Sequence, residues 1–166
     1  SITTATGLTA VGATGTASAI AGIPFYRGDG DNTSIYTHDV SGTDSTAQGN
    51  TAYGIQAMDA ITTGDNNTAI GEQSLTSVTT GSANTAVGRL SLKTVSTGVN
   101  NIAVGYEALK ANNGDANVAI GYQALLVNTT GASNIAIGST ALGATTTGVR
   151  NIAIGSNALD LQDTEN

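Results

Sequence analysis

A five-residue word that alternates between small and large side chains recurs seven times between Asn50 and Leu159. The word consists of Asn, a β-former, Ala, a large apolar residue and Gly. The closing glycines recur with a period of 17, shortened once to 16, and they are Gly54, Gly71, Gly88, Gly105, Gly121, Gly138 and Gly155. A fixed period of this length predicts a repeat architecture in which each unit stacks on the next.

The alternation within each word has period two, which is the signal of a β-strand. A second glycine follows the first at a fixed offset in most units and one position earlier at Gly114, and we expect both glycines to mark bends with positive φ. The short unit drops one residue between Ala108 and Gly114, which we place between the Leu column and the turn. The sequence therefore predicts an all-β fold, a parallel β-solenoid of 17-residue coils with two strands and two turns each. Coils spaced at roughly 4.8 Å would make a rod of roughly 30 Å.

Three columns of the repeat indicate which side chains are buried. The third position of the word is always Ala and the fourth is always large, while a Leu or Met follows a few positions after the first glycine. No residue larger than Ala occurs at the third position, which indicates a tight interior. We therefore expect the Ala and Leu columns to fill the coil. The repeat columns are represented by Asn67, Ala69, Ile70 and Gly71 in one unit and by Asn134, Ala136, Ile137, Gly138 and Leu142 in another.

The large fourth position then faces outward as a continuous aliphatic stripe. Such a stripe marks an interface. We expect the rod to be a homo-oligomer in which these columns meet, and seven such residues per chain would contribute on the order of 10 kcal/mol. If the inner and outer faces were exchanged, one face would still be exposed to water, because a coil of this length is too thin to enclose both faces.

The Asn column has two interpretations that the sequence leaves open. Asn amides stacked coil on coil can hydrogen-bond along the rod. Alternatively, Asn opens the strand as a turn residue that tolerates the left-handed conformation. Neither interpretation makes the column a ligand site.

Residues 1–49 do not carry the period, and we expect them to form an irregular cap or a junction to a preceding domain, with the solenoid spanning 50–166. Within them, residues 34–40 have strand-like composition and residues 28–32 have the composition of a polar turn. The sequence begins without Met and ends within the pattern, which we interpret as a fragment of a longer fibrous protein.

Composition argues against several classes of function. The net charge is −7 with only five Lys and Arg residues, which disfavours nucleic-acid binding. No cysteine is present, so disulfides and thiolate metal sites are excluded. No apolar run is long enough to span a bilayer and no signal peptide is visible, so membrane insertion is not expected.

Few residues suggest chemistry. His38 and Asp39 are adjacent in a strand-like segment and face opposite ways, and the Asp29–Asn32 loop lacks the acid that a calcium loop needs at its twelfth position, Val40. Paired threonines before the second glycine suggest an ice-binding ladder, but their place before a glycine favours a turn role. We expect no enzyme activity, cofactor or metal. Outward positions that could contact a ligand are Arg89, Tyr106 and Tyr122, together with Glu107 and Gln123. Plain solvent exposure is the interpretation that we favour for all of them.

The repeated Asn-x-Ala-Ile/Val-Gly word resembles the head repeats of trimeric autotransporter adhesins. The version with Ala124-Leu125 and Thr129-Thr130-Gly131 is similar to repeats in tail-fibre proteins of marine and cyanobacterial phages, as are residues 22–28 and 36–42. This resemblance covers residues 50–159 and implies a left-handed, homotrimeric fibre segment of a virion, a rigid spacer that attaches to a host receptor or glycan and to other virion proteins. The period of 17 departs from the shorter adhesin repeat. The alternatives are the head of a bacterial surface adhesin or extracellular filament, and an ice- or glycan-binding ladder protein.

Overall fold

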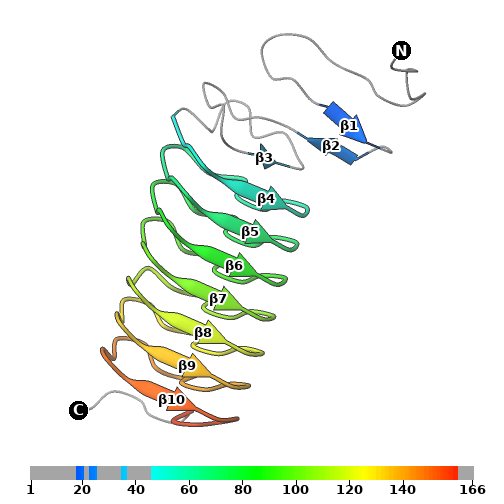
Figure 1. The fold of residues 1–166 in the computed structure, drawn as a ribbon. Helices are drawn as coiled ribbons and strands as arrows, with labels where there is room; N and C mark the ends of the chain where they lie inside the picture. Colours follow the sequence, from blue (N-terminus) through cyan, green and yellow to red (C-terminus); the bar gives the residue numbers. More distant parts are fainter. Residues whose placement is uncertain (1–17, 21–22, 26–34, 37–45, 161–166) are drawn as a thin grey trace, which may run out of the picture.

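A computed structural model describes residues 18–20, 23–25, 35–36 and 46–160 of the chain, and its ribbon is a stack of coils (Figure 1). Each coil carries one short strand. These strands are β4 Thr51–Tyr53, β5 Thr68–Ile70, β6 Thr85–Val87, β7 Ile102–Val104, β8 Val118–Ile120, β9 Ile135–Ile137 and β10 Ile152–Ile154.

The strands form one parallel sheet in sequence order, with every residue paired to its equivalent in the next coil. Ala52 pairs with Ala69, for example, and Ala136 pairs with Ala153. The all-β parallel solenoid with the period of the sequence repeat is therefore confirmed. Six complete coils separate β4 from β10.

Strand β3, Ile35–Tyr36, extends this sheet at its N-terminal edge, where Tyr36 pairs with Ala52. The side chain of Tyr36 is fully buried, so the first described layer fills its interior with one large ring. Two further strands, β1 Ser18–Ile20 and β2 Ile23–Phe25, pair antiparallel with each other and were not expected from the sequence.

The core is a narrow column of small and medium side chains inside the coils. The Ala of every strand from β4 to β10 is buried, as is the Leu or Met column from Met58 to Leu142. A third inward column begins with Ile61, Val78 and Val95 and then becomes polar. The interior predicted from the invariant Ala and Leu positions is thus the one observed, except that Leu159 in the last described coil is 42% exposed.

The second strand predicted for each coil is absent from residues 46–160, and this expectation was wrong. The chain turns there instead, with positive φ at alternating residues such as Gln73 and Leu75. Left-handed φ values curl the backbone, so the segment bonds to its neighbour coil without being extended. Leu75 N still donates to Ser91 O at 3.1 Å and Met58 N to Ser74 O at 3.1 Å.

Glycine is required in the two columns for different physical reasons, contrary to the expectation that both columns adopt positive φ. The first column does, with values from 127° to 139° between Gly54 and Gly155. The second column lies outside the left-handed region, but a Cβ on Gly81 would sit 2.6 Å from the carbonyl oxygen of Gly98. Close approach of backbones in adjacent coils therefore requires the second glycine.

The residue missing from the short unit falls within the turn itself rather than before it. Asn112 aligns with Asn128, whose Nδ2 donates to Asn112 Oδ1 at 2.8 Å. Only Asn113 then separates Asn112 from Gly114, and its Oδ1 accepts the backbone N–H of Ser96 at 2.9 Å. A side chain thus takes a hydrogen bond at the place where the backbone is one residue shorter.

Candidate functional site

The buried Asn column forms a continuous hydrogen-bonded ladder along the rod. In a typical unit, Asn84 Nδ2 donates to Gly98 O at 2.8 Å, which closes its own coil. Asn84 Oδ1 accepts from the backbone N of Asn101 at 3.0 Å and from its Nδ2 at 3.1 Å, which joins the next coil. Every asparagine of the column from Asn50 to Asn134 is buried, so each amide satisfies backbone groups that water cannot reach.

Of the two interpretations of this column, the structure supports the ladder. Beside the column, the residue with left-handed φ is the one that precedes the asparagine, for example Asn66 with φ 58° and Asn100 with φ 59°. Asn67 and Asn101 themselves are outside the left-handed region. Their invariance follows from the amide's ability to donate and accept at once. Asn67 and Asn134 are therefore structural members of the ladder.

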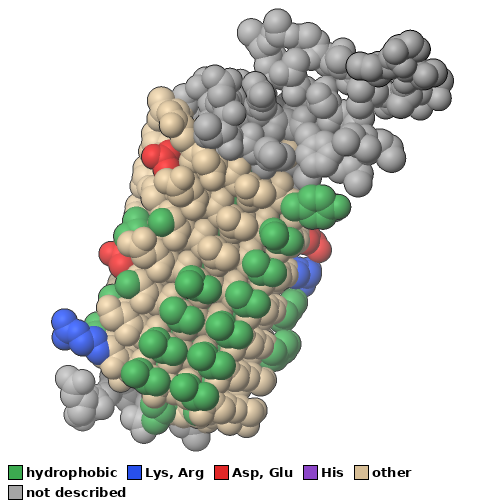
Figure 2. All heavy atoms as spheres, in the orientation of Figure 1, with side chains coloured by type: hydrophobic (Ala, Val, Ile, Leu, Met, Phe, Trp, Pro, Cys, Tyr) green, Lys and Arg blue, Asp and Glu red, His purple; other side chains and the backbone are tan. Residues whose placement is uncertain are grey.

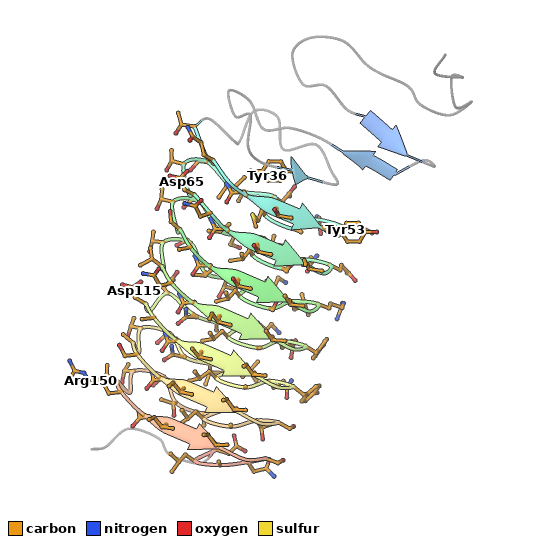
Figure 3. The ribbon with its side chains drawn as sticks, viewed as in Figure 1. Tyr36, Tyr53, Asp65, Asp115 and Arg150 are labelled. Carbon is orange, nitrogen blue, oxygen red and sulfur yellow. The ribbon has the colours of Figure 1, made fainter. Side chains whose placement is uncertain are left out.

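The outer face of the sheet carries two columns of side chains, one on each side of the buried Ala. Figure 2 shows apolar side chains in rows on this face, and Figure 3 shows Tyr53 projecting outward at its N-terminal end. Exposure on this face is greatest at β10, where Ile152 is 64% and Ile154 is 69% accessible. The fourth-position column reads Tyr53, Ile70, Val87, Val104, Ile120, Ile137 and Ile154.

The polarity of this face changes along the rod. The second-position column is Thr in β4, β5 and β6, and it is Ile or Val from β7 to β10. The aliphatic surface is consequently one column wide in the N-terminal half and two columns wide in the C-terminal half. Neither column holds an ionisable side chain other than Tyr53, so nothing on the face needs a counter-charge.

The paired threonines serve the turns, as the sequence favoured. The hydroxyls of Thr62, Thr79 and Thr129 donate to backbone carbonyl oxygens of the following coil, at 2.9 to 3.2 Å. Asp65 and Asp115 lie along the turn edge with Arg150 (Figure 3), and each carboxylate accepts a backbone N–H from the preceding coil. These polar side chains hold neighbouring coils together.

The position after the first glycine forms an exposed row with mixed chemistry. Its members are Ile55, Glu72, Arg89, Tyr106, Tyr122, Ser139 and Ser156. Arg89 pairs with Glu72 at 3.1 Å, and the hydrogen bond and charge of Glu72 raise the pKa of Arg89. The guanidinium also lies 5.7 Å from the ring centre of Tyr106, and the rings of Tyr106 and Tyr122 stack at 5.5 Å. The structure therefore brings together three of the residues that the sequence named as possible surface contacts.

Glu107 and Gln123, which the sequence placed among the outward positions, belong instead to a cluster centred on the buried side chain of Glu107. Its carboxylate accepts from Lys110 Nζ at 2.6 Å and from Gln123 Nε2 at 2.7 Å. These two hydrogen bonds, Lys110 first, lower the pKa of Glu107. The cluster links the short coil to the next one, and only the close spacing of Glu107 and Lys110 along the chain could have signalled it.

Sites that the sequence raised in the N-terminal region, His38–Asp39 and the Asp29–Asn32 loop, lie outside the described residues. Within the described part, no group of three or more His, Cys, Asp or Glu side chains is placed to hold a metal ion. The same residues contain no helix with the length and apolar character that a membrane crossing needs.

Comparisons of the chain with protein-family models, with curated proteins and with solved structures give no match. Function is therefore argued from the surfaces of the rod.

Proposed function

We propose that this chain is a structural segment of a fibre, assembled as a homotrimer whose subunits meet through the outer face of the sheet. The observation that carries the proposal is the uncovered aliphatic face from β4 to β10. A large side chain is repeated at every level of the rod, from half-buried at Val87 and Ile137 to 69% accessible at Ile154 in the last described coil. A surface of this kind is characteristic of an interface.

The size of the face suits association. Six large side chains of its two columns are between 39% and 69% exposed, and they are Tyr53, Ile70, Ile102, Ile120, Ile152 and Ile154. Because each Å² of apolar surface removed from water contributes about 25 cal/mol, covering these side chains favours association.

The polarity change along the rod favours a parallel arrangement in register. In such an assembly, the Thr half of one copy faces the Thr half of its neighbour, and the Ile/Val half faces its own kind. A fully overlapping antiparallel pair would instead place the Thr column of β4 to β6 against the aliphatic columns of β8 to β10. The parallel arrangement therefore buries more apolar surface against apolar surface.

The resemblance of the repeat to phage tail fibres and adhesin heads supports three chains, left-handed coils and a place in a virion fibre. In that role the rod is a rigid, non-enzymatic spacer that joins other fibre proteins and presents a surface to the host cell. The head of a bacterial surface adhesin uses the same architecture, and it is the second candidate on the same resemblance.

A charge placed on the outer face tests the assembly. Ile120→Asp puts a carboxylate in the middle of the face without touching the core, because Ile120 is exposed. We expect light scattering to show dissociation, while Thr130→Asp, another exposed position but on the turn, leaves the mass unchanged. An Ile120→Asp variant with unchanged mass would place the interface elsewhere.

The location in a fibre has its own test. A cryo-EM map of the particle or cell that carries the chain should contain a three-fold rod with a layer spacing of about 4.8 Å. Its presence in a virion fibre supports the first candidate, and its presence on a bacterial surface supports the second.

A further inference from the structure

The chain contains a single Asn-Gly pair, Asn113–Gly114, in the turn between β7 and β8. In longer coils a backbone carbonyl is the acceptor at this place, as when Thr79 N donates to Ser96 O at 3.0 Å. In the short coil the side chain takes over, and Asn113 Oδ1 accepts from Ser96 N at 2.9 Å. A Cβ on Gly114 would meet the carbonyl oxygen of Gly131, so the coil also requires the glycine. The shape of the short coil therefore brings an asparagine and a glycine together.

An asparagine followed by a glycine is the most reactive asparagine sequence in peptides. The backbone nitrogen of the glycine loses its proton and attacks the side-chain carbon Cγ, because no side chain hinders its approach. The amide nitrogen takes up a proton and leaves as ammonia, which gives a cyclic succinimide. Water then opens the ring at either carbonyl and gives aspartate or isoaspartate. The net change replaces an amide with a carboxylate, and no oxidant or reductant takes part.

The hydrogen bonds at the pair suit both partners of this ring closure. Negative charge develops on Asn113 Oδ1 during the attack, and this oxygen already accepts from Ser96 N and, at 3.3 Å, from Ser96 Oγ. Two donors at such an oxygen stabilise the developing charge, as in an oxyanion hole. The attacking N–H of Gly114 donates to Asn112 Oδ1 at 3.1 Å, which polarises it toward loss of its proton. Asn113 is exposed, so water reaches the ring.

The other asparagines lack this combination. Each asparagine from Asn32 to Asn157, Asn113 apart, is followed by a residue with a side chain. The seven members of the ladder are followed by Thr, Val or Ile, whose branched Cβ crowds the backbone nitrogen. Exposed asparagines such as Asn66 are followed by larger residues than glycine. Reaction should therefore begin at one place in the rod.

We propose that Asn113–Gly114 is a self-modifying site, where ring closure in the folded rod converts Asn113 to aspartate and isoaspartate. The aspartate product keeps the fold, because a carboxylate already accepts a backbone N–H of the preceding coil nearby, where Asp115 Oδ1 accepts from Val99 N at 2.9 Å. Isoaspartate adds one carbon atom to the main chain of the shortest coil and shifts Gly114 O away from the amide of Asn101. The inference goes beyond the fibre function and does not depend on the trimer.

Mass spectrometry of the full chain, stored folded at mildly alkaline pH, tests the site. Trypsin cuts after Lys110 and Arg150 and so releases residues 111–150 as one peptide, in which fragmentation locates the change. We expect Asn113 to be converted before any other asparagine, at a rate that rises with pH, and Asn113→Gln to remain unmodified because it would have to close a larger ring. Gly114→Ala is unsuitable, since its Cβ would meet Gly131 O.

The hydroxyl of Ser96 provides the test of the folded geometry. Ser96→Ala removes one donor to Asn113 Oδ1 and keeps the backbone donor, so it should slow the conversion about fivefold, the factor for one neutral hydrogen bond. Thr97→Ala, at the exposed neighbouring position, is the matched control and should leave the rate unchanged. An unchanged circular-dichroism spectrum and urea midpoint for Ser96→Ala separate an effect on the reaction from loss of the fold.

Three results would overturn the site. The first is an Asn113 that stays intact for as long as the free peptide of residues 111–119 takes to react. The second is conversion of another asparagine first. The third is a rate that Ser96→Ala leaves unchanged or raises, which is the result expected if only unfolded chains react.

Discussion

Replacing Asn101 with Ala should weaken the rod far more than replacing its neighbour Asn100. Asn101 is fully buried in the ladder, whereas Asn100 is exposed. Asn101 Oδ1 accepts from Asn117 N at 3.0 Å, and Asn101 Nδ2 donates to Gly114 O at 2.9 Å. The alanine variant loses these two bonds and also the two amide–amide bonds of the ladder, Asn101 Nδ2 to Asn84 Oδ1 at 3.1 Å and Asn117 Nδ2 to Asn101 Oδ1 at 3.3 Å.

The size of the destabilisation depends on which buried groups lose a hydrogen-bond partner in the alanine variant. Gly114 O keeps a second donor, Asn112 Nδ2 at 3.0 Å, so the loss of the donor from Asn101 costs little free energy. The backbone N–H of Asn117 loses its acceptor in the ladder and stays buried and unpaired, which costs about 1–3 kcal/mol. The other bonded groups keep a partner, since Asn84 Oδ1 still accepts from the backbone N of residue 101 and Asn117 Nδ2 still donates to Gly131 O. Adding about 1 kcal/mol for the remaining side-chain bonds together, we expect a total destabilisation of about 3 kcal/mol.

Asn100→Ala is a demanding control, because it changes the same residue type at the adjacent position. Alanine already occupies the equivalent left-handed position at Ala83, with φ 57°, and at Ala116. We expect its effect to stay below about 1 kcal/mol. Urea unfolding followed by circular dichroism, at one fixed protein concentration, measures both variants. Equal midpoints for the two variants would refute the ladder as a source of stability.

Three further predictions concern other contacts. Gly81→Ala should destabilise the rod by about 3 kcal/mol, because its Cβ would meet the carbonyl oxygen of Gly98, whereas exposed Thr80→Ala should change the urea midpoint little. Folding lowers the pKa of Glu107. The stability that its hydrogen bonds add to the fold is therefore present above the ordinary glutamate pKa, and it is lost as the pH falls through the lowered value. Glu107→Gln should therefore flatten the loss of stability between pH 6 and about pH 3, and an unchanged pH profile would contradict the assignment. Because the chain has no cysteine, Ile70→Cys and Ile137→Cys report on strand direction: each should form disulfides with its own copy in a parallel assembly, and mixed Ile70–Ile137 disulfides would indicate an antiparallel one.

The sequence was sufficient to predict the solenoid, its period and its faces. A column such as Ala69, Ala86 and Ala103 that never changes size can only be a tight interior, and the adjoining column with Ile70 and Val87 can only face the other way. Burial follows this pattern in every strand from β4 to β10.

The second side of the coil could not be predicted in the same way. Leu75 and Gln73 adopt left-handed φ, a conformation that side chains of their type disfavour, so local preference pointed to a strand. Packing of the Leu column and hydrogen bonds between coils override that preference. The reason for a glycine at Gly81 could not be predicted either. A close approach between coils depends on tertiary contacts, and it selects glycine just as a positive φ does.

The stacked row was only partly visible in the sequence. Tyr106 and Tyr122 hold the same position in successive units, so the period placed them on adjacent coils, but their stacking and the cover by Arg89 needed coordinates.

The central claim is that the aliphatic face of the sheet holds identical chains together. Light scattering coupled to size exclusion, run on the full chain over a hundredfold range of concentration, tests it directly. We expect a stable species of about three times the chain mass of 16.3 kDa. A soluble, folded species at 16.3 kDa throughout that range would contradict it.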